Sequence, residues 1–193
     1  MSTTQPIRSK QLLHDFKEYF LTKQPNSRNY TLILIGLNTA LRINDILHLT
    51  WGDVYCTEHS RFYTHLLITE KKTEKETRIL INRELQETLL SYRTTQPSIA
   101  DTDYLFPSPR KADSPLSRYQ AYRIVRKAAE AVGIEDVIRC HSLRKTFGYH
   151  AWKMGTPPAL LMEIYNHSSF QITNHYLGIE QDDKDAVFRD IQL

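Results

Sequence analysis

Residues 141–144 read His-Ser-Leu-Arg, at the start of a helix that the sequence predicts over about residues 141–154. His141 and Arg144 are three positions apart, so a helix places both side chains on one face. Further along the chain, His167 lies 23 residues after Arg144, and Tyr176 lies 32 residues after it. Histidine and arginine at this spacing are common by chance, so the pair gains meaning only from the residues around it.

Two more basic residues precede this run. Arg42 stands in Thr-Ala-Leu-Arg-Ile-Asn-Asp (39–45), where one apolar helix turns into the next. A surface arginine paired with Asp45 is the plainer interpretation, but an arginine at an apolar helix junction needs a buried or bound partner. Lys72 lies in the charged run Lys-Lys-Thr-Glu-Lys-Glu (71–76), for which a solvated turn is the alternative interpretation.

Six side chains spread along the chain form one ordered set: Arg42, Lys72, His141, Arg144, His167 and Tyr176. In order and spacing this set resembles the tyrosine recombinase (phage integrase) family, from its first catalytic motif to its last. The resemblance implies an enzyme that cuts and rejoins double-stranded DNA through a 3′-phosphotyrosyl intermediate. A tyrosine that holds the DNA end covalently conserves the bond energy, so no metal and no cofactor is expected.

The resemblance implies that Arg42 and Arg144 share the two non-bridging oxygens of the scissile phosphate. Arginine suits this task because its planar fork of donors stays charged at any working pH. The family's first arginine motif reads Gly-Leu-Arg-x-x-Glu/Asp-Leu, and Asp45 fits its acidic position, where it would orient Arg42.

Tyr176 would be the nucleophile, and its proton must leave during attack because a phenol has a pKa of about 10. His141 would accept that proton or bind the phosphate, since an unshifted imidazole pKa of about 6.5 permits either role. His167 would donate to the phosphate. Asn166 replaces the glycine that relatives carry before this histidine, and Asn also tolerates a left-handed turn.

In the family, a lysine of the charged turn protonates the departing 5′ oxygen. Lys71, Lys72 and Lys75 compete for this role here, and Glu74 replaces the family's glycine. A lysine followed by threonine favours Lys72.

Apolar spacing predicts helices that begin near Ser9, Ser27, Arg83 and Ser117, and three more after residue 140. Alternation over 62–68 and 79–81 predicts one β-hairpin around the charged turn, and prolines predict an irregular connection over 107–115. The pattern is α+β, mostly helical with one small antiparallel sheet, which matches the catalytic domain of the family.

The composition is that of a globular protein: 193 residues, 40% hydrophobic and 24% charged, with a net charge of +3. No apolar run approaches the ~20 residues of a membrane span, and Met1 to Lys10 is polar, with no apolar signal core behind it. Cys56 and Cys140 suggest no disulfide bridge, and the eight histidines form no His-Glu-x-x-His motif. We therefore expect a cytoplasmic, nucleoid-associated protein without a metal site.

Charge is distributed unevenly. Residues 117–153 hold eight Lys/Arg against three acidic residues, a net +5, whereas 154–193 hold two against six, a net −4. This asymmetry is expected when one face meets phosphate. The helix after Ser117 is the predicted DNA contact, with Arg118 and Gln120 as base readers and Arg123 as a phosphate clamp.

Most relatives carry a core-binding domain ahead of the catalytic one, and only 41 residues precede Arg42. We expect one catalytic domain over 1–193, either a short member like the fimbrial-switch invertases or a cut chain. The tail, 177–193, has acidic and apolar residues and is expected to dock on a neighbouring protomer. The expected assembly is a homotetramer on paired sites and a monomer alone, with accessory DNA-bending proteins as possible partners.

Two other functions fit the same residues. One is a DNA-binding relative that does not cut, and the other is a type IB topoisomerase-like enzyme that relaxes DNA without exchanging strands. Six filled positions argue against the first, and the Leu-Arg-Ile-Asn-Asp-Ile-Leu and His-Ser-Ser motifs argue against the second.

Overall fold

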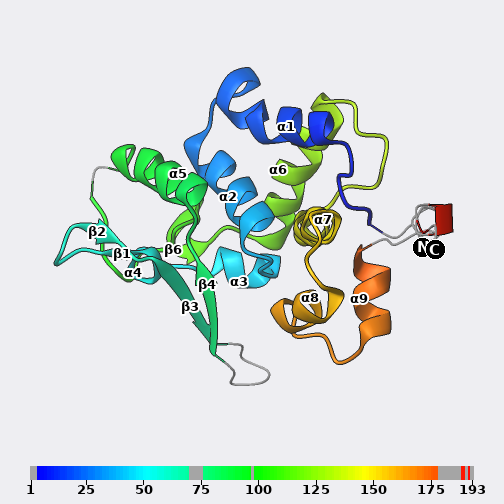
Figure 1. The fold of residues 1–193 in the computed structure, drawn as a ribbon. Helices are drawn as coiled ribbons and strands as arrows, with labels where there is room; N and C mark the ends of the chain where they lie inside the picture. Colours follow the sequence, from blue (N-terminus) through cyan, green and yellow to red (C-terminus); the bar gives the residue numbers. More distant parts are fainter. Residues whose placement is uncertain (1–3, 70–75, 97, 178–187, 190, 192–193) are drawn as a thin grey trace.

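The computed structural model describes residues 4–69, 76–96, 98–177, 188–189 and 191. Lys72 and most of the tail lie outside the described residues. The helices are, in chain order, α1 (Lys10–Glu18), α2 (Ser27–Asn38), α3 (Ile43–Leu47), α4 (Trp51–Val54), α5 (Arg83–Thr94), α6 (Arg118–Ala131), α7 (Cys140–Lys153), α8 (Pro158–Ile164) and α9 (Phe170–Leu177), with a π-helical turn, η1 (Tyr19–Lys23), directly after α1 (Figure 1).

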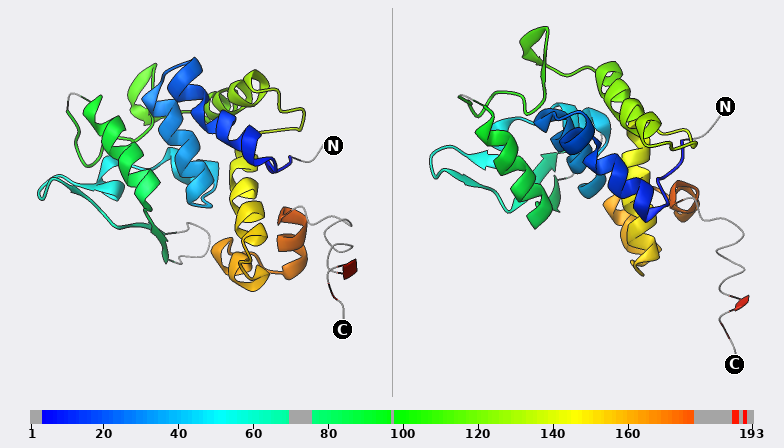
Figure 2. Two further views of the ribbon diagram at one scale, coloured as in Figure 1. Left: turned by 45° about the horizontal axis from the view of Figure 1, so that its top comes forward. Right: turned by 90° about the horizontal axis from the view of Figure 1, so that it is seen from above.

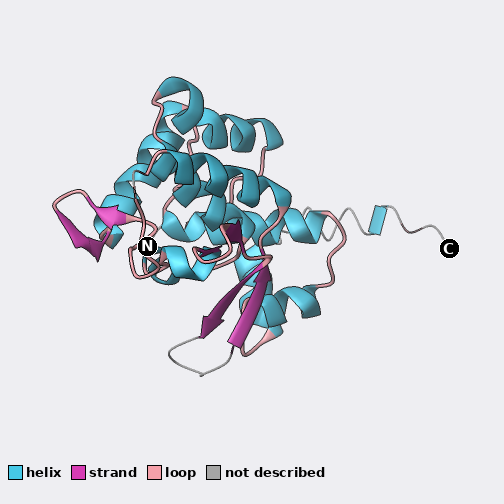
Figure 3. Ribbon diagram, turned by 90° about the vertical axis from the view of Figure 1, so that its left-hand side faces the viewer, coloured by secondary structure: helices cyan, strands magenta, loops and turns pink. Residues whose placement is uncertain are grey.

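The described strands form three antiparallel pairs: β1 (Tyr55–Cys56) with β2 (Arg61–Phe62), β3 (His65–Thr69) with β4 (Glu76–Leu80), and β5 (Pro107–Ser108) with β6 (Lys111–Pro115). The predicted hairpin is β3–β4, which projects from the helical body (Figure 3). Its register runs from His65 opposite Leu80 to Thr69 opposite Glu76. The α+β class is confirmed, and two further strand pairs are added. Both are too short or too rich in proline to produce an alternating pattern.

Side-chain caps start the helices where the sequence indicates. Ser9 Oγ accepts the N–H of Leu12 at 3.3 Å, and Ser117 Oγ accepts that of Gln120 at 3.2 Å. The second helix is capped one residue before the predicted Ser27, by the side chain of Asn26. Caps of this kind satisfy backbone donors that the first helical turn leaves unpaired.

Helix α2 runs through the middle of the molecule, between α1, α5 and α7 (Figures 1 and 2). Its consecutive residues Leu32, Ile33, Leu34 and Ile35 are all buried, because packing elements surround the helix. A helix that is apolar on all sides belongs in the core of a domain.

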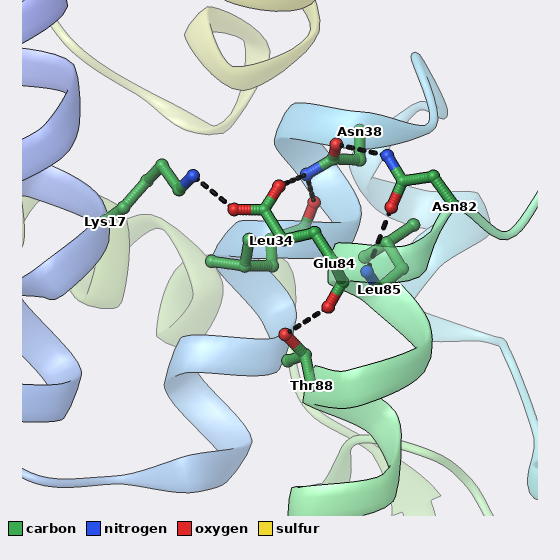
Figure 4. A network of polar contacts seen from close by, with 7 residues as sticks. All are labelled: Lys17, Leu34, Asn38, Asn82, Glu84, Leu85 and Thr88. Atoms are coloured by element: carbon green, nitrogen blue, oxygen red, sulfur yellow. Dashed lines mark hydrogen bonds and ion pairs between the residues drawn. The ribbon is translucent and has the colours of Figure 1, made fainter.

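A polar network fixes the C-terminal end of α2 (Figure 4). The carboxylate of Glu84 in α5 pairs with Lys17 of α1 and accepts a hydrogen bond from Asn38 Nδ2 at 3.2 Å. Asn82 Nδ2 donates in turn to Asn38 Oδ1 at 2.8 Å. Three helices are thereby tied together just ahead of the turn that carries Arg42.

A second, smaller apolar cluster lies among α7, α8 and α9. Its buried members are Ala40, Leu161, Tyr165, Tyr176 and Leu177. The cluster brings residues separated by more than 120 positions together, and Phe147, Ala151 and Trp152 of α7 pack against it. No helix in the described part of the chain has the length and hydrophobicity required to cross a lipid bilayer.

Candidate active site

Helix α7 carries two of the predicted residues in its first turns. The residue before it, Arg139, is extended, and its N–H donates to Ser142 Oγ at 3.1 Å. The helix therefore begins at Cys140, and His141 and Arg144 fall three positions apart on one side. The predicted helical placement of the pair is confirmed.

Arg144 ties together two loops that are distant in the sequence. Its side chain is buried, with the residue only 5% exposed. One η nitrogen donates to the carbonyl oxygen of Ala40, and the other donates to that of Tyr165 at 2.8 Å. These carbonyls stand two residues before Arg42 and two residues before His167. Arg144 therefore anchors the backbone that presents both side chains.

Each of these loops contains a left-handed residue. Ala40 has φ of 55° and Asn166 has φ of 51°. Asn166 stands where relatives have glycine, and the expectation that asparagine serves a left-handed turn there is confirmed. Ala40 occupies the glycine position of the Gly-Leu-Arg motif, which explains why that motif has a glycine.

Arg42 is the exposed N-cap residue of α3. Its charge reaches the cluster, because it contributes to lowering the pKa of both His141 and His167. Asp45 lies in the first turn of the same helix and donates its backbone N–H to the Arg42 carbonyl at 2.9 Å. Asp45 also lines a cavity of about 340 Å³ that reaches Arg144.

Tyr176 is 8% exposed and lies in the middle of the cluster. Its hydroxyl is 3.3 Å from Nδ1 of His141. The tyrosine ring meets the rings of His141 and His167 edge to face, each at a centroid distance of 4.9 Å. The guanidinium carbon of Arg144 lies 6.0 Å from the centroid of the tyrosine ring. One chain therefore brings four of the predicted side chains together, with Arg42 close enough to influence them.

Burial governs the protonation states in this cluster. Burial raises the pKa of Tyr176 to about 12, although the charges of Arg144 and Arg42 act in the opposite direction. Burial, followed by the charges of Lys145, Arg144 and Arg42, lowers the pKa of His141 to about 4. His141 is therefore neutral at pH 7, as a proton acceptor must be.

His167 is oriented by two neighbours. Its Nδ1 lies 3.1 Å from Oγ1 of the buried Thr173, and its ring stacks on Tyr165 at 5.1 Å. Burial, followed by the charges of Arg144 and Arg42, lowers the pKa of His167.

Tyr165 belongs to the site and was missed from the sequence. Its hydroxyl donates to the Arg144 carbonyl at 2.8 Å, and its ring lies 4.7 Å from the guanidinium carbon of the same arginine. Gly148 makes room for it, since a Cβ there would come within 2.0 Å of the Tyr165 hydroxyl. The available signal was its place in Tyr-Asn-His (165–167), where relatives carry leucine.

Known proteins resemble this chain in both sequence and fold. The model of the phage integrase family matches residues 5–182. The chain belongs to the phage integrase family. It is 43% identical to the probable integrase/recombinase YoeC of Bacillus subtilis, over 98% of this chain and 97% of that protein. It is 30% identical to the type 1 fimbriae regulatory protein FimB of Escherichia coli, over 78% and 72% of the two chains.

Solved structures share the fold. The crystal structure of XerA recombinase superposes with a TM-score of 0.78 at 20% identity, over 99% of this chain and 68% of XerA. The XerH recombinase, bound to a palindromic difH substrate, gives 0.76 at 19% identity over 98% of this chain and 54% of XerH. With its relatives, this places the chain among the site-specific tyrosine recombinases, which are DNA strand transferases.

In this recombinase, Lys72 lies outside the described residues, and its role as general acid stays a prediction. The strands that flank it are described. Thr77 and Arg78 of β4 line the same cavity as Asp45 and Arg144. The hairpin therefore borders the active site.

The predicted DNA helix is α6. Arg118 and Arg123 are exposed on it, whereas the Gln120 side chain accepts the Ser117 N–H at 3.0 Å and so takes part in the cap. The charge of Arg118 reaches Cys140, where it opposes the rise in pKa that burial causes. The start of α6 thus lies near the start of α7. Tyr119, which is 68% exposed, is a further candidate that the sequence did not single out.

Within the described residues, no group of three or more His, Cys, Asp or Glu is arranged to hold a metal ion. Cys56 and Cys140 are both free thiols.

Proposed function

We propose that this recombinase cuts double-stranded DNA with Tyr176 and rejoins it through a 3′-phosphotyrosyl intermediate, so that a DNA segment is integrated, excised or inverted. One observation carries the proposal: the Tyr176 hydroxyl lies 3.3 Å from a neutral His141 and beside the buried Arg144, all within one chain. A tyrosine that merely packed in the core would not need this set of cations.

The chemical step follows from the roles of these groups. The phenol oxygen of Tyr176 bonds to phosphorus while the bond from phosphorus to the 5′ oxygen breaks. The phenol proton passes to Nδ1 of His141, and the 5′ oxygen takes a proton from Lys72. Arg42 and Arg144 stabilise the phosphorane through charge-assisted hydrogen bonds, so catalysis is positioning plus electrostatics. Attack by the 5′ hydroxyl of another strand reverses the step and completes recombination.

Covalent capture tests this proposal. The target sequence is first selected: a pool of nicked duplexes with random half-sites is incubated with the unmodified protein, and the duplexes that become covalently attached are recovered. One recovered duplex then serves as the probe. Tyr176→Phe should form no adduct yet bind the same duplex with nearly unchanged affinity, because only the nucleophilic oxygen is lost. Capture should survive EDTA, since side chains supply the positive charge.

An SDS-resistant adduct with Tyr176→Phe, or strict dependence on Mg²⁺, would contradict the assignment. A relative that binds DNA without cutting would give no adduct with the unmodified protein. A topoisomerase-like enzyme would relax supercoiled plasmid without joining strands from different sites.

The general acid is tested separately. Lys72→Ala should slow capture, and a 5′-bridging phosphorothiolate should restore it because sulfur leaves without a proton. If Lys72→Ala captures DNA normally and the phosphorothiolate instead restores capture by Lys71→Ala or Lys75→Ala, that lysine is the general acid.

We further propose that residues 1–193 act as one catalytic domain and assemble into a homotetramer on paired sites, with tail 177–193 docked on the next protomer. Accessory DNA-bending proteins and a nucleoid location are part of the same proposal. Support comes from relatives alone, such as a lambda integrase fragment solved as a dimer on a COC′ core site. Deleting 183–193 should leave half-site binding intact and prevent pairing of sites, measured by gel shift. Unchanged pairing would show that the tail docks on its own domain.

A further inference from the structure

The first described residues lie along α7, the helix that carries His141 and Arg144 (Figures 1 and 2). We call residues 4–8 the N-terminal strap. Ile7 is buried, its N–H donates to Thr146 Oγ1 at 2.9 Å, and its carbonyl lies 2.9 Å from Nε2 of His150. The strap is therefore fixed to α7 by backbone contacts at both ends of one helical turn.

Lys145 connects this strap to the nucleophile. It is 7% exposed, and its ammonium donates to the carbonyl oxygen of Thr4 at 2.7 Å. The same ammonium nitrogen lies 5.6 Å from the centroid of the Tyr176 ring, within the range of a cation–π contact. Residues 4, 145 and 176 are thus joined through one side chain.

The position is a poor one for a lysine whose purpose is stability alone. Its neighbours Arg144 and Arg8 are cations, and burial together with the charge of Arg8 lowers the pKa of Lys145. An apolar side chain of similar length would avoid both the desolvation and the repulsion. What a cation adds here, besides its effect on the pKa of His141, is attraction to the face of the tyrosine ring.

We propose that Lys145 is a positioning residue of the strand-transfer reaction: its ammonium, fixed by the Thr4 carbonyl, holds the Tyr176 ring against His141. The inference rests on the proposed role of Tyr176 as the nucleophile. Attraction between the ammonium and the ring grows as the phenol becomes a phenolate, so the contact strengthens in the transition state, where it accelerates attack.

Two half-reactions separate positioning of Tyr176 from general damage to the site. Cleavage is followed as covalent capture of the selected nicked duplex at saturating DNA. Joining is followed in matched Tyr176→Phe backgrounds with a DNA strand that ends in a 3′-p-nitrophenyl phosphate, so that only a 5′ hydroxyl displaces the p-nitrophenolate. Lys145→Met should slow cleavage about tenfold, with joining, DNA affinity and melting temperature close to those of the unmodified protein.

Lys145→Arg should restore most of the cleavage rate because it keeps the cation. Lys153→Met, which removes an exposed lysine from the same helix, is the matched control and should cleave normally.

Unchanged cleavage by Lys145→Met would overturn the inference and leave the role of Tyr176 intact. Equal slowing of cleavage and joining would also overturn it, since that pattern marks a structural role. If Lys145→Met fails to fold, the cleavage rate of Lys145→Arg tests the inference instead. A folded Lys145→Arg protein that cleaves at one tenth of the normal rate or less would overturn it. Absence of any adduct from the unmodified protein would overturn the proposed function and this inference with it.

Discussion

Arg144 is buried beside other positive charges, an arrangement that costs free energy and that an anion such as the proposed scissile phosphate would offset. The carbonyl oxygens of Ala40 and Tyr165 and the face of the Tyr165 ring offset part of the desolvation. Its remaining N–H groups are suited to phosphate because the guanidinium fork is rigid and always charged. At the residue scale, the site is a cationic cluster whose orientation is set before DNA binds.

Acid should destabilise the protein partly through His141. Its pKa falls from 6.5 to about 4 on folding, so between these values the unfolded chain binds more protons. The stability contributed above pH 6.5 is therefore lost as the pH falls toward 4. We expect urea unfolding to show a smaller loss of stability between pH 7 and pH 5 for His141→Gln than for the unmodified protein. The exposed His59→Gln is the control, and identical pH dependence for all three proteins would contradict the prediction.

The left-handed conformation of Asn166 leads to a second prediction. Asn166→Val should lower the free energy of unfolding by about 1–2 kcal/mol, because a β-branched side chain is strained at positive φ. Asn166→Gly should be nearly neutral. Capture of DNA should fall for the valine variant as well, since the turn presents His167. Equal stability of the two variants by urea unfolding would show that the turn does not need a left-handed residue.

At the scale of elements, α7 approaches α8 and α9 closely at Gly148. A Cβ there would come within 2.0 Å of the Tyr165 hydroxyl and 2.9 Å of a Leu177 methyl carbon. The hydroxyl in turn holds the Arg144 carbonyl. The close packing of these helices at Gly148 therefore also fixes the position of the Arg144 backbone in the site.

Gly148→Ala should destabilise the protein by about 1–3 kcal/mol through overpacking and should slow DNA capture by the folded fraction. Gly133→Ala is the matched control: φ is +74° with no atom near the new methyl, so about 1 kcal/mol of strain and normal capture are expected. Both are measured by urea unfolding and adduct yield. Normal capture by folded Gly148→Ala would show that Tyr165 can shift without moving Arg144.

Helix α6 offers two arginines in different settings. Arg118 is exposed at its start, near α7, whereas Arg126 pairs with Glu130 on the same helix. Arg118→Ala should weaken binding to the selected duplex about tenfold or more, the expected loss for a base or phosphate contact. Arg126→Ala should have little effect on a gel-shift titration. The reverse order would place the DNA contact toward the other end of α6.

At the scale of the whole molecule, a basic middle segment and an acidic end are combined in a chain of small net charge. Binding of one protomer to a half-site should be weak and should fall steeply with salt, because phosphate contacts release bound counterions. A titration between 50 and 200 mM salt should show affinity falling by orders of magnitude. Nanomolar binding with little salt dependence would point to contacts dominated by apolar surface.

Much of the secondary structure was predictable from local sequence. The helix caps at Ser9 and Ser117, the left-handed Asn166 and the β3–β4 hairpin depend on a few neighbouring residues each, so pattern and turn chemistry suffice. The extra strand pairs β1–β2 and β5–β6 were missed because strands of two residues carry no periodicity and the five-residue β6 ends at a proline.

The sequence by itself determined the family, because the family is recognised from the identity and spacing of a few residues. These are Arg42, His141, Arg144, His167 and Tyr176, and they can be read without a structure. Tertiary structure alone decided how they meet: Arg144 bound to two distant carbonyls, Tyr165 beneath it, and Lys145 between the N-terminal strap and Tyr176. These contacts join residues up to 141 positions apart. Their existence depends on how α7, α8 and α9 pack, and a linear pattern does not encode which buried side chains then touch.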